Sequence, residues 1–285
     1  MKVLVTGATG FIGNYVVGEL LRRRLSIIAN SRFRRNELDF PWLERVDYVQ
    51  ADLSEKKGDW FSFFKKPEML IHLAWEGLPN YNESFHLERN LPNNCYFLQN
   101  IIEKGLEKVV ITGTCFEYGM QRGVLAESLE VKPDNPYALA KDSLRKYLEK
   151  LQKQINFDLK WIRLFYMYGN GQNSNSILSQ LETALEREEK VFNMSGGEQL
   201  RDYLPVEKVA EYIVRISIQD KISGIINCCS GKPISIRQLV ENYLEKRQKN
   251  IRLNLCYYPY PDHEPMAFWG DDTKLRTILC EAESK

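Results

Sequence analysis

Histidine is scarce in this chain, and closely spaced cysteine motifs are absent. There are only 3 His and 6 Cys, the cysteines standing at positions 95, 115, 228, 229, 256 and 280. No Cys-x-x-Cys pair occurs, although zinc sites and disulfide frameworks usually show regular spacings of this kind. We therefore expect no metal site, and we expect free thiols in a reducing compartment.

Charge of one sign and long apolar runs are lacking as well. The 39 Lys and Arg balance 38 Asp and Glu, which leaves a net charge of +1 at pH 7. Such a balance gives no long-range field that would gather the protein onto nucleic acid or an anionic membrane. No stretch approaches the roughly 18 apolar residues of a membrane span, and residues 2–6 run into a glycine turn without room for a signal peptide. These features predict a cytoplasmic protein that binds neither nucleic acid nor a membrane.

The chain does have enough apolar residues for a large core. Of its 285 residues 44% are hydrophobic, and short runs rich in Val, Ile and Leu alternate with longer amphipathic stretches. This alternation is typical of βα units on a parallel sheet with helices on both faces. The pattern predicts strands at 2–6, 26–30, 46–50, 68–73, 107–112 and 158–165, and helices at 11–23, 83–104 and 137–154.

The alternation of strands and helices loosens after Gly169. A polar loop at 170–175 precedes a charged helix at 176–190, and the order of elements then becomes mixed. We expect an α/β protein in which a doubly wound parallel sheet is accompanied by a smaller mixed α/β substrate domain. The first domain is assigned to residues 1–169 and 199–228, and the second to residues 170–198 and 229–285.

A glycine-rich turn joins the first strand to the first helix. Gly7 permits the sharp turn, Gly10 lets the backbone approach a pyrophosphate, and Gly13 lets the helix pack closely on the strand. The free N–H groups at the start of the helix favour an anion there. We therefore assign dinucleotide binding to this turn, with contributions from Thr9, Phe11 and Ile12.

The end of the second strand lacks the carboxylate that an NAD site usually places on the ribose 2′-hydroxyl. The window instead contains Ser31, Arg32 and Arg35. A guanidinium suits the 2′-phosphate of NADP, so NADPH is the expected cofactor, with NADH as an alternative. The competing interpretation is a solvated basic loop. At the end of the third strand, Asp52 and Leu53 are assigned to the adenine, although Asp52 could instead cap a helix.

A phenol and an ammonium stand four residues apart at Tyr137 and Lys141, on one face of a predicted helix. A lysine beside a tyrosine favours the phenolate, which allows proton exchange with a substrate oxygen. Upstream, the apolar strand 107–112 leads to Thr114, whose hydroxyl either faces the site or caps the next turn. Leu73, Ala74 and Trp75 follow the fourth strand, at the edge where open α/β sheets bind ligands, and are assigned to the cofactor.

Together these motifs resemble the extended short-chain dehydrogenases/reductases, and within them the nucleotide-sugar epimerase/dehydratase/reductase group. The resemblance rests on the glycine turn, Thr114 before Tyr118-Gly119, Tyr137-x-x-x-Lys141, and the segments 163–169 and 201–206. It implies a Rossmann fold in which Thr114 binds the reacting oxygen, Tyr137 transfers the proton and Lys141 orients both. It also implies that Arg201 contacts the substrate diphosphate. A homodimer is implied through helices 83–104 and 137–154, with apolar surface from Phe97, Ile101, Tyr147, Leu148 and Leu151.

Two departures from the family narrow the chemistry. Sugar-nucleotide 4,6-dehydratases place an Asp-Glu pair directly after the hydroxyl residue, whereas this chain has Cys115-Phe116. GDP-fucose-synthase-type epimerases place a Cys two residues after it and add a His, and this pair is missing too. Cys115 is therefore expected to be a packed thiol. Hydride and proton transfer at one carbonyl remains, and the chain is similar to reductases of dTDP-4-keto-6-deoxyhexoses that serve deoxysugar and O-antigen synthesis.

The aromatic and proline-rich segment 257–271 is assigned to the sugar nucleotide, although it could equally be the small domain's own core. The expected substrate contacts are Trp75, Asn90, Thr114, Cys115, Phe116, Arg201, Glu264 and Trp269. Asn90 is left open between backbone and substrate. His72 is expected to be a satisfied strand-end residue, and His86, on a charged helix, to be solvated.

Two other functions stay open at this point. An epimerase that keeps NAD bound would show an acidic residue at the end of the second strand and a cofactor that co-purifies. A non-catalytic NADP-binding redox sensor would typically have lost the Thr, Tyr and Lys set, which is complete here.

Overall fold

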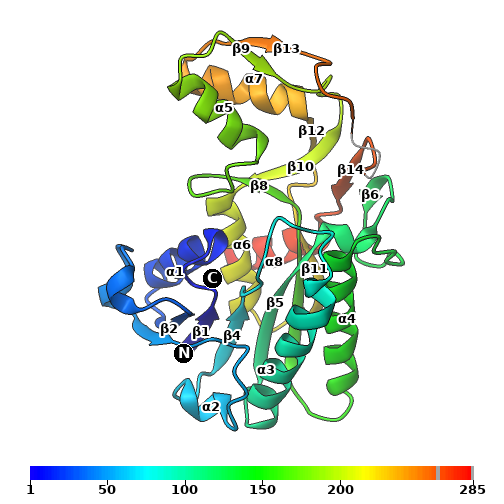
Figure 1. Ribbon diagram of the computed structural model, residues 1–285. Helices are drawn as coiled ribbons and strands as arrows, with labels where there is room; N and C mark the ends of the chain where they lie inside the picture. The colour runs from blue at the N-terminus through cyan, green and yellow to red at the C-terminus, as the bar shows by residue number, and fades with distance from the viewer. Residues whose placement is uncertain (261–263, 284–285) are drawn as a thin grey trace.

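The structure is a computed structural model that describes residues 1–260 and 264–283, and its centre is a seven-stranded sheet (Figure 1). All seven strands are parallel, in the order β11-β7-β5-β4-β1-β2-β3. They are β1 (Lys2–Thr6), β2 (Ser26–Ser31), β3 (Asp47–Gln50), β4 (Met69–His72), β5 (Lys108–Thr114), β7 (Asp158–Leu164) and β11 (Gly224–Cys228). The predicted doubly wound sheet is confirmed. Strand β11 lies in residues 199–228, which were assigned to this domain without a strand being given bounds there.

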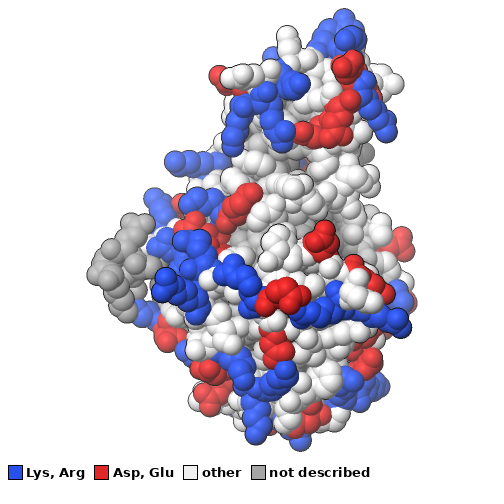
Figure 2. Space-filling view, turned by 90° about the vertical axis from the view of Figure 1, so that its left-hand side faces the viewer, with Lys and Arg blue, Asp and Glu red and all other residues white. Residues whose placement is uncertain are grey.

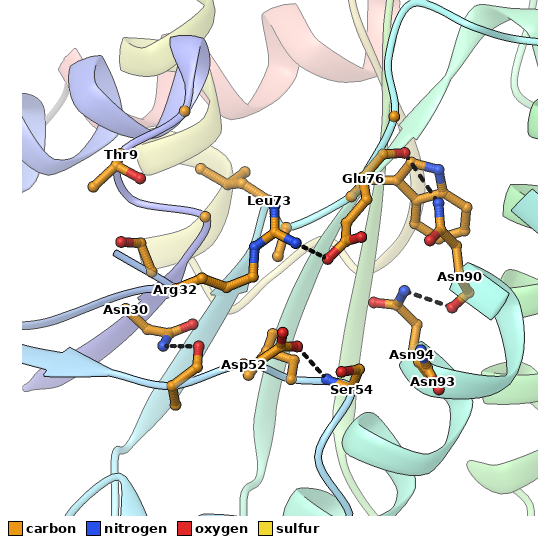
Figure 3. Close-up of a pocket in the computed structure, with 18 of the residues that line it drawn as sticks. Thr9, Asn30, Arg32, Asp52, Ser54, Leu73, Glu76, Asn90, Asn93 and Asn94 are labelled. Carbon is orange, nitrogen blue, oxygen red and sulfur yellow. Dashed lines mark hydrogen bonds and ion pairs between the residues drawn. The ribbon is translucent and has the colours of Figure 1, made fainter. Parts of the chain in front are cut away.

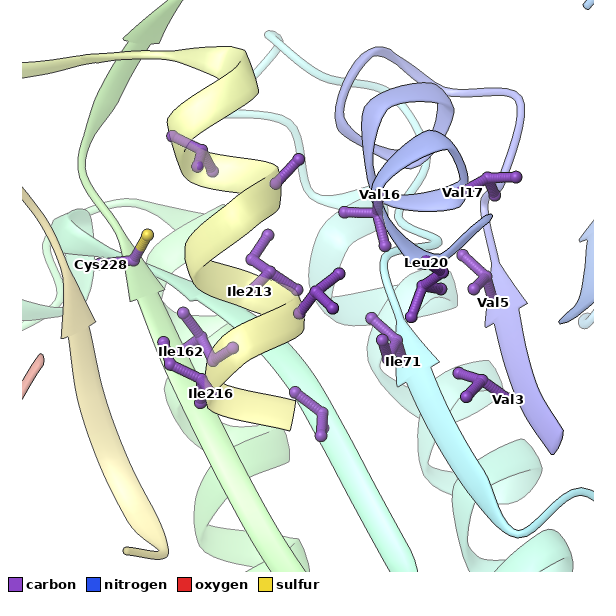
Figure 4. Close-up of a cluster of buried hydrophobic side chains, with 14 of the residues drawn as sticks. Val3, Val5, Val16, Val17, Leu20, Ile71, Ile162, Ile213, Ile216 and Cys228 are labelled. Atoms are coloured by element: carbon purple, nitrogen blue, oxygen red, sulfur yellow. The ribbon is translucent and has the colours of Figure 1, made fainter. Parts of the chain in front are cut away.

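Helices cover both faces of this sheet because successive side chains of a strand point to opposite sides. Val3 and Val5 of β1 pack with α1 (Phe11–Arg22), α6 (Val206–Ile218) and α8 (Thr273–Glu283) (Figure 4). Leu4 of the same strand packs with α2 (Trp60–Phe63), α3 (Leu91–Glu103) and α4 (Pro136–Leu151). The chain therefore has two apolar cores, one on each face of the sheet.

The order of the strands reverses between β1 and β4. From β1 the chain proceeds to β2 and β3 on one side, and it then crosses to β4 and β5 on the other. In open α/β sheets, ligands bind at such a reversal, beside the carboxyl ends of the strands. The predicted glycine turn follows β1 directly at this point.

A smaller unit lies beyond the carboxyl ends of the strands, at the top of Figure 1. It contains α5 (Ile177–Glu186), α7 (Ile236–Arg247) and short strands β8 (Tyr166–Tyr168), β9 (Val191–Asn193), β10 (Leu200–Pro205), β12 (Pro233–Ser235) and β13 (Arg252–Asn254). Strand β10 pairs with β8 and β12, although the sequence pattern assigned residues 199–228 to the large sheet. Strands β6 (Gly123–Leu125) and β14 (Phe268–Gly270) form a further pair.

The helix predicted over 83–104 has two parts. Residues His86–Asn90 form a π-helix, and α3 continues from Leu91. In α3 and α4, four of the five side chains expected to form an apolar dimer surface are instead buried in the chain's own core. These are Phe97, Ile101, Leu148 and Leu151. The residue assignment of that surface is therefore wrong, because these side chains cover the sheet.

Basic and acidic side chains are intermixed on the face of the molecule drawn in Figure 2. Among the residues that the structure describes, no helix is both long and apolar enough to cross a bilayer.

Candidate active site

A cavity of about 350 Å³ lies at the strand reversal, and Figure 3 shows how its side chains converge. Its walls come from the glycine turn, the ends of β2 and β4, the loops after β3 and β4, and the start of α3. The predicted residues that line it are Gly7, Thr9, Gly10, Ser31, Arg32, Asp52, Leu53, Leu73, Ala74, Trp75 and Asn90. Most of the predicted cofactor residues are therefore brought together around one space.

The glycine turn is shaped for a close approach of backbone to ligand. Gly7 has φ +71°, and a Cβ there would lie 2.8 Å from the backbone nitrogen of Ala74. A Cβ at Gly13 would lie 2.1 Å from the carbonyl oxygen of Gly7, so the first turn of α1 packs directly on the loop. Any side chain at either position would open the turn. Phe11, Ile12 and Gly13 stand behind the cavity wall and do not line it. The loop and cavity thus fit a dinucleotide pyrophosphate at the start of α1.

The two arginines assigned to the 2′-phosphate have different surroundings. Arg32 lines the cavity, and its Nη1 donates to Glu76 Oε1 at 2.6 Å across the opening (Figure 3). Arg35 is outside the cavity lining, where its Nη2 donates to Leu43 O at 3.0 Å and lies 2.9 Å from Glu44. The structure therefore places Arg32 at the cofactor cavity and points Arg35 elsewhere.

Asp52 lines the cavity and also stabilises its own loop. Its Oδ1 accepts a hydrogen bond from the backbone nitrogen of Ser54 at 2.8 Å. The Ser31 hydroxyl is similarly engaged, by the hydroxyl of Tyr48 at 2.6 Å. The helix-cap interpretation of Asp52 is wrong, because the next helix, α2, begins at Trp60 and is capped by Asp59. The assignment of Asp52 to the adenine stays a prediction.

Thr114, Tyr137 and Lys141 come together from β5 and α4. Asn135 caps α4 by accepting from Ala138 N at 2.9 Å, which fixes Tyr137 in the first turn of the helix and Lys141 one turn later. The Thr114 side chain is hydrogen-bonded to Tyr137. Its oxygen also caps the next turn, accepting from Phe116 N at 3.3 Å. The Thr114 hydroxyl therefore faces the site, as one interpretation expected, and also caps the next turn, as the other expected.

The ionisation of this set is governed by burial. Burial raises the pKa of Tyr137 well above its usual value, and the hydrogen bond to Thr114 offsets this only in part. Burial also lowers the pKa of Lys141 to about 7, against which the negative charge of Glu117 acts weakly. The expectation of a tyrosine pKa lowered by its lysine is therefore wrong for this structure, because burial dominates the Tyr137 pKa and the nearby Glu117 charge raises it further. Tyr137 carries its proton.

Trp75 and His86 complete the wall beside Lys141, and the sequence did not predict the second of them. Trp75 Nε1 donates to His86 Nδ1 at 3.0 Å, and the Lys141 ammonium lies 4.0 Å from the centre of the Trp75 ring. His86 is fully buried, so the expectation of a solvated side chain is wrong. Asn90 donates to the Glu76 carbonyl oxygen at 3.0 Å and also lines the cavity, so its contact with a substrate stays a prediction.

A buried ion pair fixes the end of β5. Glu117 accepts from Arg163 Nε at 2.8 Å and from Thr114 N at 2.9 Å. Because the carboxylate is committed to these donors, it holds Thr114 in place and is not free to act as an acid. Cys115 is buried beside it, and burial raises the pKa of its thiol, as expected for a packed cysteine.

The residues assigned to the substrate side gather around Arg201. This side chain is 1% exposed, and its Nη2 donates to Glu264 Oε2 at 2.8 Å. The guanidinium also lies 4.5 Å from the ring of Phe268. Trp269 is the next residue on β14, so its side chain points to the opposite face and is half-buried. The remaining residues of the aromatic segment include positions 261–263, which lie outside the described residues.

The ring of Phe116 links the two halves of the site. Tyr81 lies 5.0 Å from Phe116 and 5.5 Å from Tyr137, measured between ring centres. Phe116 in turn lies 6.2 Å from Tyr166, whose hydroxyl is buried without a hydrogen-bond partner. The catalytic set and the arginine are thus joined by one aromatic wall. Tyr166 lies in the segment 163–169 that the sequence motifs flagged, but nothing in the spacing singled out Tyr166 or Tyr81.

His72 is the satisfied strand-end residue that was expected. Its Nδ1 bonds to the Thr6 hydroxyl at 2.8 Å and its Nε2 to Asn94 Oδ1 at 2.6 Å, and burial lowers its pKa to about 3.

Within residues 1–260 and 264–283, no three His, Cys, Asp or Glu side chains are grouped as metal ligands.

Comparison with known proteins shows the family of the chain. Residues 3–229 match the NAD dependent epimerase/dehydratase family, and the chain belongs to it. Its relatives act on nucleotide sugars. It is 31% identical over 277 residues to the dTDP-6-deoxy-L-talose 4-dehydrogenase (NAD(+)) of Aggregatibacter actinomycetemcomitans, covering 95% of this chain and 99% of that enzyme. It is 23% identical to the dTDP-4-dehydro-6-deoxyglucose reductase of Escherichia coli, covering 87% of this chain and 82% of the reductase.

Solved structures show the same architecture. The UDP-N-acetylglucosamine 4-epimerase from Methanobrevibacter ruminantium M1, in complex with UDP-N-acetylmuramic acid, superposes with a TM-score of 0.84 at 25% identity, over 97% of this chain and 91% of the epimerase. MoeE5 in complex with UDP-glucuronic acid and NAD superposes with a TM-score of 0.80 at 24% identity, over 98% of this chain and 93% of that one. The protein is therefore a Rossmann-type enzyme of the extended short-chain dehydrogenase/reductase class.

Proposed function

We propose that the protein is an NAD(P)H-dependent 4-ketoreductase of a nucleotide-linked 4-keto-6-deoxyhexose, with a dTDP sugar as the preferred substrate. The observation that carries this proposal is the joining of Thr114, Tyr137 and Lys141 without any free acid or thiolate beside them. The similarity to a dTDP-6-deoxytalose 4-dehydrogenase supports the choice of sugar, because oxidation of that hydroxyl is the reverse of the proposed reduction.

Each residue of the set has one task in the proposed reduction. A bound nicotinamide supplies the hydride to carbon 4. Thr114 donates a hydrogen bond to the carbonyl oxygen, which stabilises the negative charge that develops there. Tyr137 then gives its proton to the same oxygen, because an alkoxide is a far stronger base than a phenolate. Lys141 positions Tyr137 and the nicotinamide ribose. A protonated Tyr137 is the form required at the start of reduction, and burial keeps it in that form.

Two side chains beside this set, Glu117 and Cys115, are unsuited to the acid–base steps of dehydration and epimerisation. Glu117 is engaged by Arg163 and by Thr114 N, so it cannot abstract the carbon-5 proton needed for loss of water. The Cys115 thiol is buried and kept protonated, so it is a poor base for epimerisation. Reduction of one ketone is the reaction that the remaining groups can perform.

In this proposal the seven-stranded sheet and its helices hold the dinucleotide, and the smaller unit, to which β8 and β10 belong, holds the sugar nucleotide. Arg201 meets the diphosphate. NADPH is favoured over NADH because Arg32 is the cation that lines the cavity at the end of β2.

The protein is also proposed to be a homodimer, through the outward faces of α3 and α4. Leu139 is exposed on α4, and Ser143 and Tyr147 follow it at successive turns, both half-buried. The Tyr147 hydroxyl bonds to Gln99 on α3, so the two helices present one continuous surface.

The test is to incubate the protein with NADPH and a panel of dTDP-, CDP- and GDP-linked 4-keto-6-deoxyhexoses. We expect loss of NADPH absorbance with at least one dTDP sugar, and a product whose carbon-4 configuration is assigned by NMR. The reverse reaction, NADP⁺ reduction by a dTDP-6-deoxyhexose, is the matched control. No NADPH oxidation with any 4-keto sugar would refute the proposal, and redox-neutral inversion of a hydroxyl would show an epimerase.

A further inference from the structure

His86 is buried at a place where the backbone is irregular. The π-helix His86–Asn90 precedes α3, and both of its end residues are buried. π-Helical turns are rare in proteins, and those that occur are often found at functional sites. Here the turn directs an imidazole toward the catalytic helix: the ring centre of His86 lies 5.3 Å from that of Tyr137.

The hydrogen bonds around His86 define one neutral tautomer. Its Nε2 lies 2.9 Å from the carbonyl oxygen of Asn80, which can only accept, so Nε2 carries the proton. Its Nδ1 therefore accepts, and it faces two donors, Trp75 Nε1 at 3.0 Å and Asn90 Nδ2 at 3.3 Å. Burial lowers the pKa of His86, which keeps the ring in this form. A protonated ring would place a donor against the indole N–H.

The indole that His86 holds lies against the ammonium of Lys141. The Lys141 Nζ is 4.0 Å from the centre of the Trp75 ring, and it donates to Thr112 O at 2.9 Å. The Trp75 ring also meets Tyr137 edge-on, with 5.9 Å between ring centres. An aromatic face attracts a cation most strongly where water is excluded, and Lys141 is 2% exposed.

We propose that His86 and Trp75 form a positioning pair for Lys141: the imidazole fixes the indole, and the indole face holds the ammonium beside Tyr137. This inference rests on the proposed function, in which Lys141 serves Tyr137 and the nicotinamide ribose. Neither His86 nor Trp75 exchanges a proton with the substrate. They act by keeping Lys141 charged and in place.

The other ionisable groups that face Lys141 are His72, Tyr137 and Glu117. His72, at the end of β4, is neutral because burial lowers its pKa to about 3, and Tyr137 is protonated. Glu117 favours the charged ammonium, but it is ion-paired with Arg163 and does not offset the effect of burial. The aromatic face of Trp75 lies directly against the ammonium, so its removal should disfavour the charged form.

Three variants separate the roles. Trp75→Leu removes the aromatic face, and His86→Leu removes the acceptor that fixes it. His86→Asn keeps an acceptor oxygen near the position of Nδ1. The matched control is Trp42→Leu, since Trp42 is another buried tryptophan with a bonded N–H, 2.7 Å from Asn14 Oδ1, and lies in the core on the opposite face of the sheet.

The measurement is the pH dependence of NADPH binding, followed by NADPH fluorescence, together with kcat for the ketoreduction. We expect binding to weaken as Lys141 loses its proton. In Trp75→Leu the midpoint falls by about one pH unit, the size expected from loss of a desolvated cation–π contact. His86→Leu shifts the midpoint in the same direction, and His86→Asn restores it. Trp42→Leu lowers stability but leaves the midpoint unchanged.

Wild-type midpoints in both leucine variants would overturn the proposal, and so would a His86→Asn protein that behaves like His86→Leu. If Trp75→Leu does not fold, the comparison of the two His86 variants decides. If the wild-type protein binds NADPH but reduces no 4-keto sugar, the proposed function fails while the binding midpoints still test the positioning pair.

Discussion

The proposed preference for NADPH depends on whether Arg32 binds the 2′-phosphate of the cofactor or stays paired with Glu76. Its guanidinium lies 2.6 Å from the carboxylate of Glu76, and the two side chains are 52% and 49% exposed. An ion pair this exposed is worth at most about 1 kcal/mol. Hydrogen bonds from a guanidinium to a phosphate are charge-assisted and worth about 1.5–3 kcal/mol. A 2′-phosphate should therefore displace Glu76 from Arg32. The net binding free energy is the energy of the phosphate hydrogen bonds minus that of the ion pair.

The perturbation is Arg32→Ala, with Glu76→Gln as its counterpart. Subtracting the cost of breaking the ion pair leaves a net loss of about 0.5–2 kcal/mol for Arg32→Ala, which is about a 2- to 30-fold weaker NADPH complex. Removing the carboxylate frees Arg32, so Glu76→Gln should tighten NADPH binding by up to about 5-fold. NADH, which has a 2′-hydroxyl, should change little in both variants.

The assay is titration calorimetry with NADPH and NADH on the wild-type protein and each variant. Arg35→Ala is the matched control, because Arg35 is bonded to Leu43 O and points out of the cavity. It should bind both cofactors like the wild type. Equal affinity of the wild-type protein for NADPH and NADH would refute the assignment of Arg32 to the 2′-phosphate.

Further outcomes follow from the same structure. Tyr137→Phe and Thr114→Val should each lower kcat by about 100-fold or more, the scale for loss of a general acid, with NADPH affinity nearly unchanged by calorimetry. Arg201→Ala should weaken dTDP-sugar binding by about 2–5 kcal/mol without affecting NADPH. His72 has a pKa of about 3 in the folded chain against 6.5 as the reference, so between these values only the unfolded chain binds the proton. The free energy of unfolding should therefore fall with falling pH, by up to about 1.4 kcal/mol per unit, and urea unfolding of His72→Gln should show a shallower slope. Sedimentation at micromolar concentration should show a dimer, and a monomer would contradict the proposed α3–α4 interface.

The parts of this protein that could be predicted are those whose signal is local. The Gly7, Gly10 and Gly13 turn lies in seven consecutive residues, and the structure shows that a Cβ at two of them would strike backbone. Tyr137 and Lys141 share a helix face through their spacing alone. The core strands of the large sheet were visible as apolar runs. Strand β11 could not be given bounds, because its five residues begin with an exposed glycine and include Asn227, and its pairing to β7 is long-range.

His86 could not be found in this way. With Glu83, Glu88 and Arg89 as neighbours, a regular helix over 83–104 would place the ring on a charged face. The π-helix adds a residue to the turn and rotates His86 and Asn90 inward, where both are buried. The cross-cavity pair of Arg32 and Glu76 was hidden for a different reason: the residues are 44 positions apart and meet only because β2 and β4 flank β1.

The ion pair between Arg201 and Glu264 was not predicted from the sequence. Both were assigned to the substrate separately, and they stand 63 residues apart. A guanidinium that is 1% exposed needs a partner, because an uncompensated buried charge is strongly unfavourable. Glu264 supplies it, and the ring of Phe268 supports the guanidinium from one side. The carboxylate of Glu264 therefore partly offsets the positive charge with which Arg201 would attract a diphosphate. For this reason Glu264→Gln should tighten dTDP binding while Arg201→Ala weakens it, and calorimetry showing the same direction for both would mean that the pair only stabilises the fold.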